Sequence, residues 1–276
     1  AGAAAAVGAA TASSILGGKT KTAARAAEAS AEAAPWKPLP SIQLGSHRLS
    51  RLVAGANPLH GGSYQGAHAT HCMKEYFTPE RKVEFLERCE RAGITAHQFS
   101  NYKNSDYIRA ARDCGVRMSF FGLHADISTI KDAIKSVQPI ALVHHGGVTD
   151  RLFADGKHQQ VRDFVKAVHD GAVMAGVSAH NPDCIKRIAD EGWDVDFFMT
   201  CFYFLTRKVS KVDCETRTLQ LVYPFFKNDP IRMTEVVRQV DQPCLGFKIL
   251  AAGRRCANQQ MVQGAFRFAF SNIKPT

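Results

Sequence analysis

The sequence predicts a (β/α)8 TIM barrel with an N-terminal β-hairpin, truncated before its eighth strand. Three observations lead to this α/β fold. The chain has 276 residues, and a single barrel domain often has about 250 residues. From residue 35 onward, apolar runs of strand length alternate with amphipathic runs of helix length, which is typical of βαβ units and a parallel sheet. Seven such units follow in order, and the last expected helix has no strand after it.

Residues 1–34 are nearly all Ala, Gly, Ser and Thr, so they cannot form a core. An Ala/Gly-rich, weakly apolar stretch of this kind resembles the remnant of a twin-arginine export signal, although it contains no arginine pair. We therefore predict a periplasmic or secreted protein, with a flexible Ala-rich linker as the alternative for this segment. The barrel is expected to cover residues 35–276. It contains no apolar run of the ~20 residues that a bilayer span needs, so no membrane insertion is expected after signal removal.

The hairpin is expected at residues 41–44 and 48–52, which flank Gly45 and Ser46. Strands are then expected at residues 52–56, 94–99, 117–123, 140–143, 175–178, 195–201 and 244–250. Helices are expected at residues 79–92, 105–114, 128–136, 159–174, 182–191, 231–239 and 258–272. A doubly wound open sheet is the alternative. Against it, no G-x-G-x-x-G dinucleotide motif follows the first expected strand.

Charge and cysteine content exclude two classes of protein. Lys and Arg number 35 against 25 Asp and Glu, a net charge of +10. The basic residues are scattered singly, without the basic and aromatic runs that follow a phosphate backbone, so nucleic acid is not an expected partner. The eight cysteines include no C-x-x-C pair, which argues against a disulfide scaffold. The expected partner is a small-molecule substrate, and the oligomeric state is left open.

Histidines gather at the expected carboxyl ends of the strands, where barrel enzymes hold their active sites. Neutral imidazole is a common ligand of Zn, Mn and Fe. We therefore predict a divalent metal bound by residues at five strand ends: His97, His124, His144, His180 and Cys201. No H-x-H or H-E-x-x-H spacing accompanies them. The alternative is that each histidine is hydrogen-bonded separately in a polar mouth.

Several segments resemble the aldo-keto reductases. SIQLGSHRLSRLVAGANPLHGG is similar to the hairpin and first strand of that family, and RAGITAHQF to its second strand. ALVHH resembles its fourth strand, GVSAHNPDCIKRI its fifth strand and following helix, and VQGAFRFAF the helix before its last strand. The resemblance covers residues 41–273. It implies a barrel that binds NADP and reduces carbonyl groups with an Asp, Tyr, Lys and His set.

The resemblance also assigns roles to individual positions. The Asp of the family falls on Gln98, its Lys on His124 and its His on His144, while its Tyr falls one residue from Tyr102. Loss of the Asp and Lys removes the charges that lower the Tyr pKa in that family. The positions that contact the nicotinamide amide fall on Ser178 and Asn181.

Lys248 lies in the seventh expected strand, where Leu245, Phe247 and Ile249 alternate with it. We expect the bulky residues to face the helices and Lys248 to point inward. A buried ammonium needs a partner, either a carboxylate, such as Glu75 or Asp126, or an oxygen of the substrate.

Three functions remain open at this point. The first is an exported aldo-keto reductase-like barrel enzyme with a His-rich, metal-assisted site that acts on a small sugar-like or carbonyl substrate as a hydrolase, lyase or isomerase. The second is an NADP-dependent oxidoreductase in which Tyr102 gives the proton beside His144. The third is a non-catalytic barrel that binds a ligand at its mouth.

The predicted catalytic residues are His144, Lys248, Tyr102 and Gln98. His144 and His124 should face one cavity, while His145 should point the other way or lie in the loop.

Overall fold

A computed structural model describes residues 39–207 and 223–274. Residues 1–34 lie outside these ranges, so their assignment to an export signal stays a prediction. Among the described residues, no helix is both long enough and apolar enough to cross a bilayer.

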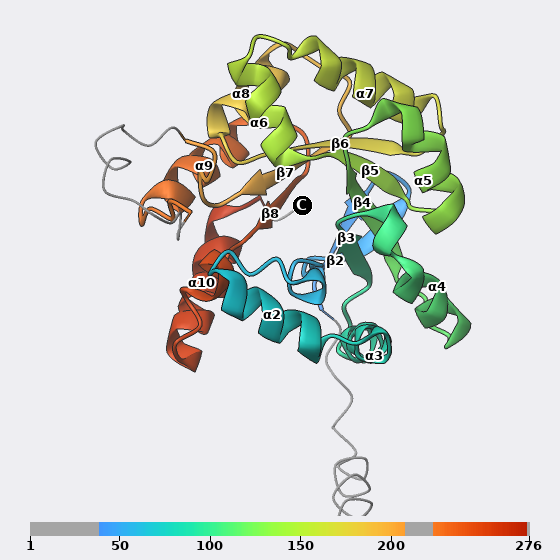
Figure 1. Cartoon of the computed structure of the whole chain (residues 1–276). Coiled ribbons are helices and arrows are strands. Elements are labelled where there is room, and N and C mark those ends of the chain that lie inside the picture. Colours follow the sequence, from blue (N-terminus) through green and yellow to red (C-terminus); the bar gives the residue numbers. More distant parts are fainter. Residues whose placement is uncertain (1–38, 208–222, 275–276) are drawn as a thin grey trace, which may run out of the picture. The chain divides into compact units, whose positions relative to one another are not determined.

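A curled sheet of six parallel strands forms the centre of the fold (Figure 1). The strands are β3 (Ala96–Phe99), β4 (Ser119–His124), β5 (Ala141–His144), β6 (Met174–Ala179), β7 (Phe197–Cys201) and β8 (Cys244–Phe247). Each strand pairs with the next one along the chain. A doubly wound sheet would reverse its strand order at one point, and this sheet does not. The predicted (β/α)-barrel class is therefore confirmed.

The first expected strand is reduced to one parallel bridge between Ala54 and His97. The backbone N–H of Ala54 donates to the carbonyl of Ala96 (3.0 Å), and the N–H of Gln98 donates to the carbonyl of Ala54 (2.8 Å). The segment around Ala54 therefore lies beside β3 as the first expected strand would, but only Ala54 takes part in the β-ladder.

Helices lie around the outside of the curled sheet (Figure 1). Those at the expected positions are α3 (Pro79–Arg91), α4 (Asp106–Asp113), α5 (Ile130–Val137), α7 (Gln159–His169), α8 (Pro182–Asp190), α9 (Asp229–Gln239) and α10 (Gln259–Asn272). Two more helices, α2 (Ala67–Tyr76) and α6 (Gly146–Ala154), occupy segments that were not expected to be helical. Helix α2 has no buried residue and α6 begins with two glycines, so neither has the apolar periodicity that predicts a helix.

Side chains of the strands divide between two apolar layers. The layer between sheet and helices includes Phe120, Leu142, Val177 and Phe198 with Phe164 of α7. The layer inside the curl includes Ala96, Phe121, Ala141, Val143, Phe197 and Met199. The hairpin of β1 (Ser41–Leu44) and β2 (His47–Ser50) adds Leu44 and Leu49 to this inner layer. The hairpin thus closes the amino ends of the strands, and their carboxyl ends are left for polar groups.

The inward and outward faces of the last strand are the reverse of those predicted. Leu245 and Phe247 pack against the inner layer, because the inside of a barrel is itself a packed core. The strand ends at Phe247. Lys248 follows it in a left-handed conformation with φ 58°, so the lysine belongs to the turn after the strand.

Candidate functional site at the carboxyl ends of the strands

A cavity of 420 Å³ opens at the carboxyl ends of β3, β4 and β5. Its lining includes Tyr102, Lys103, His124, Asp126 and His145. The rings of Tyr102 and His124 lie 5.7 Å apart. Two of the predicted site residues, Tyr102 and His124, are thus brought together at the end of the barrel where enzymes of this fold class bind substrates.

A histidine–carboxylate pair lies next to this cavity, after β6. Nδ1 of His180 donates to Oδ2 of Asp150 on α6 (3.0 Å). The same carboxylate accepts from the backbone N–H groups of His180 (3.0 Å) and Asn181 (3.2 Å) and from the hydroxyl of Thr206 (2.8 Å). The side chains of His180 and Asp150 are 9% and 4% exposed. Because a carboxylate only accepts, the proton of neutral His180 lies on Nδ1, and Nε2 carries the lone pair.

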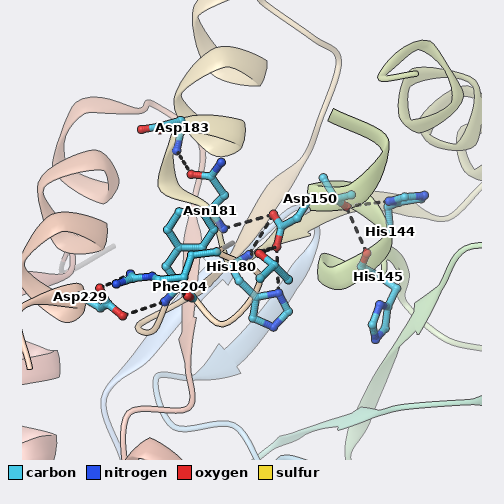
Figure 2. Close-up of polar contacts among 11 residues, drawn as sticks. His144, His145, Asp150, His180, Asn181, Asp183, Phe204 and Asp229 are labelled. Atoms are coloured by element: carbon cyan, nitrogen blue, oxygen red, sulfur yellow. Dashed lines mark hydrogen bonds and ion pairs between the residues drawn. The ribbon is translucent and has the colours of Figure 1, made fainter. Parts of the chain in front are cut away.

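His145 and Lys248 border the same mouth. Figure 2 shows the imidazoles of His145 and His180 pointing to the same side, with His144 directed away from them. Nζ of Lys248 lies 4.5 Å from the centre of the Phe247 ring, and the His180 ring lies 5.8 Å from that ring. No described carboxylate forms an ion pair with Lys248. The predicted partners are engaged elsewhere, since Glu75 pairs with His71 and Asp126 accepts from Ser128.

The electrostatics of the mouth keep both imidazoles neutral. Desolvation lowers the pKa of His180. The hydrogen bond to Asp150 acts in the opposite direction, and the charge of Lys248 lowers the pKa further. Desolvation also lowers the pKa of His145, and His180 and Lys248 lower it further. Near neutral pH both residues therefore present unprotonated nitrogens, which is the state that a general base needs.

The prediction that His144 faces the barrel cavity is wrong. His124 and His144 are register partners on β4 and β5, but only His124 lines the cavity, with its Nε2 2.9 Å from the carbonyl oxygen of Asp126 in the following loop. His144 is 1% exposed, packs against Phe164 (4.9 Å between ring centres) and donates from Nδ1 to the Thr149 hydroxyl (2.7 Å). Burial lowers its pKa to about 3. The adjacent His145 lies after the strand, at the start of α6, as one of the two predicted alternatives allows, and it lines the cavity.

His97 is also a buried structural residue. Its Nδ1 donates to the carbonyl of Ala54 (3.0 Å), and its Nε2 accepts from the hydroxyl of Tyr107 (2.8 Å). Both ring nitrogens are therefore occupied, and neither can bind a metal.

The predicted metal set does not converge. His97 and His144 are buried on the helix-facing side. His124 lines the cavity with its Nε2 beside the Asp126 carbonyl, and His180 lies after β6. Cys201 is fully buried in an apolar cluster with Phe202 and Leu205. Burial raises the pKa of the Cys201 thiol to about 11, so it is no ready thiolate ligand. Within residues 39–207 and 223–274, no three His, Cys, Asp or Glu side chains gather closely enough to hold a metal ion. These donors do not fit the predicted site.

The positions assigned by the aldo-keto reductase resemblance do not form one constellation either. The Gln98 amide donates to the backbone carbonyl of Phe99, while His144 lies on the opposite face of the sheet. Asn181 accepts from the N–H of Asp183 (3.0 Å) and caps α8, as Figure 2 shows. Ser178 is 1% exposed. It packs against Gly146 so closely that a Cβ on residue 146 would lie 2.8 Å from Oγ of Ser178.

Sequence reasoning missed Asp150 and Thr206, which hold His180 in place. Asp150 lies on α6, a helix without an apolar pattern, and Thr206 follows β7. The chain contains no motif that links residue 150 to residues 180 and 206. Only the curvature of the sheet brings them together.

Comparison with known proteins reveals no close relative. No protein-family model matches the chain, and no curated protein matches it. In structure it is similar to the truncated 3-deoxy-D-arabino-heptulosonate 7-phosphate synthase from Thermotoga maritima, with 13% identity and a TM-score of 0.47 over 85% of this chain and 77% of that one.

Two further solved structures are similar at lower scores. The N-acetylmannosamine-6-phosphate 2-epimerase from Clostridium perfringens is 11% identical, with a TM-score of 0.36 over 69% of this chain and 85% of that one. Mandelate oxidase with benzoyl-formic acid is 13% identical, with a TM-score of 0.40 over 87% of this chain and 77% of that one. At these scores the likeness says nothing about activity, and the fold class rests on the strand order described above.

Proposed function

We propose that the chain is a (β/α)-barrel enzyme that transfers protons on a small polar carbonyl compound, with His180 as its general base and acid. The observation that carries the proposal is the His180–Asp150 pair. A carboxylate that accepts four hydrogen bonds is held rigidly, and it fixes both the tautomer and the orientation of the imidazole. The pair lies directly after β6 (Met174–Ala179), at the carboxyl end of the strands, where barrel enzymes hold their active sites.

The neighbouring groups support the same chemistry. His145 supplies a second neutral imidazole on the wall of the cavity. Its ring N–H can donate a hydrogen bond to the carbonyl oxygen while His180 removes the proton and returns it. The 420 Å³ cavity is in the size range of small-molecule sites. Its mixture of an aromatic ring, a lysine, a carboxylate and imidazoles favours a polar ligand. The reaction class is therefore removal and return of a proton beside a carbonyl group, as in isomerases, epimerases and lyases.

Solvent exchange tests this proposal without knowledge of the natural substrate. The purified chain is incubated in D2O with small hydroxycarbonyl compounds, both neutral ones such as dihydroxyacetone and glucose and anionic ones such as dihydroxyacetone phosphate and hydroxypyruvate. Proton NMR then follows the loss of the hydrogen beside the carbonyl. We expect exchange that His180→Gln reduces at least ~100-fold, the lower end of acid–base contributions. His47→Gln, a change in the hairpin at the other end of the barrel, should leave it unchanged. Equal exchange by wild type and His180→Gln would contradict the proposal.

A second candidate is NADP-dependent carbonyl reduction on an aldo-keto reductase-like barrel. It is favoured by the hairpin that closes the amino ends of the strands with Leu44 and Leu49, as the resemblance implied. In this candidate Tyr102, beside His124 in the cavity, gives the proton. Fluorescence titration with NADPH separates the two candidates, because saturable quenching at micromolar concentration would favour this one. Absence of quenching together with His180-dependent exchange would favour the first.

A further inference from the structure

We propose that the mouth contains a binding site for an oxyanion, a carboxylate or a phosphate, centred on Lys248 and bordered by Arg254. The proposal rests on the proposed function, because it names the chemical class of the molecule on which His180 acts. It restricts the substrate to a carbonyl compound that carries a permanent negative charge.

Lys248 is held in place by features that are unusual for a surface lysine. Its φ of 58° is a left-handed conformation, which non-glycine residues adopt at an energetic cost and which clusters at functional sites. Its Nζ lies 4.7 Å from the centre of the Tyr64 ring and 4.5 Å from the centre of the Phe247 ring. Phe247 also contacts the His180 ring. The ammonium and the imidazole thus border the same aromatic side chain.

Further cations lie near the end of β8 without a carboxylate partner among the described residues. Arg254 donates to the backbone carbonyls of Tyr64 (3.0 Å) and Ala251 (3.3 Å), and its guanidinium lies 4.1 Å from the centre of the Phe225 ring. Nε of Arg255 is buried with no hydrogen-bond partner in the described part of the chain. None of these contacts neutralises a positive charge.

Two carboxylates among the described residues of this region, Asp150 and Asp229, are already engaged. Asp150 accepts the four hydrogen bonds described above. Asp229 forms an ion pair with Arg207 and accepts from the N–H groups of Phe204 (3.1 Å) and Phe226 (3.4 Å). Among the described residues, the end of β8 therefore has an excess of positive charge in partly buried surroundings, where a charge acts more strongly than in water. Such an excess attracts ligands of the opposite sign.

These cations lie where they could bind an anionic group of the substrate of His180. An anionic group beside Lys248 would hold the substrate at one end, and its carbonyl end would then lie between the ammonium and the imidazoles of His180 and His145. Binding energy from a group that does not react would position the part that does.

Equilibrium dialysis tests the site with two probes, inorganic phosphate and acetate, at matched ionic strength. We expect saturable binding of one equivalent of at least one probe. Binding of phosphate alone assigns a phosphorylated ligand, and binding of acetate alone assigns a carboxylate. Lys248→Met should weaken binding at least tenfold, while Lys248→Arg, which keeps the cation, should bind within about threefold of wild type. The matched control is Lys135→Met, which removes the same charge from exposed Lys135 in the last turn of α5.

The outcomes separate this inference from the proposed function. Saturable binding that Lys248→Met weakens and Lys135→Met leaves intact supports the site. Absence of saturable binding of both probes to wild type overturns it, as does equal binding by Lys248→Met and wild type. Because His180→Gln leaves the cations in place, that variant should bind the probes like wild type. Loss of exchange activity and loss of anion binding can therefore be observed independently.

Discussion

Two buried histidines should make the folded state sensitive to acid. His97 is fully buried and His144 nearly so, and desolvation lowers the pKa of each from 6.5 to about 3. The unfolded chain takes up these protons near its ordinary histidine pKa, whereas the folded chain does not take them up until far lower pH. The free energy of unfolding therefore falls as the pH drops from 6.5 toward 3. Between pH 7 and pH 5 the linkage relation gives a loss of about 2 kcal/mol for each histidine.

Urea unfolding of wild type and His144→Gln at pH 7, 6 and 5 measures this effect for one residue. The readout is the change in unfolding free energy with pH, because glutamine does not titrate and any loss of packing shifts all three values alike. Wild type should lose about 2 kcal/mol more than His144→Gln between pH 7 and pH 5. Leu142→Ala, which leaves a cavity in the same strand but removes no titrating group, serves as the control and should show the pH dependence of wild type. An identical pH dependence for wild type and His144→Gln would refute the assignment of His144 as a buried neutral residue.

Three other predictions follow from the site and the core. Gly146→Ala places a Cβ 2.8 Å from Ser178 Oγ and 3.2 Å from His180 Cε1, so it should displace the imidazole and lower deuterium exchange at least ~10-fold. Gly147→Ala meets nothing closer than 3.4 Å and should retain exchange; equal rates for the two variants would count against the placement of His180. Asp150→Asn replaces one of the two oxygens that accept hydrogen bonds from four donors, so the free energy of unfolding in urea should fall by about 1–3 kcal/mol. An unchanged midpoint would argue against this hydrogen-bond network. Iodoacetamide should label exposed Cys72 in the native chain but Cys201 only after unfolding, and peptide mass spectrometry showing early labelling of Cys201 would disprove its burial.

The alternation of apolar and amphipathic runs was sufficient to predict the order of strands and helices, because each buried strand and each amphipathic helix leaves its own period in the sequence. It could not predict which side of a strand faces inward. Both faces of a barrel strand are apolar, as Phe120 on the outer side and Phe121 on the inner side of β4 show. Alternation in the sequence therefore does not show which face of a strand points into the barrel.

The points where strands end decided which polar residues reach the mouth. β5 ends at His144, and the chain turns at His145 into α6, so the second histidine of the pair lines the cavity. β8 ends at Phe247, three residues before the predicted end, so Lys248 occupies a turn. A shift of one residue moves a side chain to the other face, and sequence patterns locate strand ends less accurately than that.

The tautomer and titration of His180 test the central claim most directly. Long-range ¹H–¹⁵N spectra of the histidine side chains, recorded between about pH 7 and pH 5, with His180→Gln used to assign its signals, report which ring nitrogen carries the proton. The structure predicts neutral His180 with the proton on Nδ1 toward Asp150 and a pKa below its ordinary value of 6.5. A proton on Nε2, or a pKa at or above 6.5, would contradict the assignment of His180 as the base of this site.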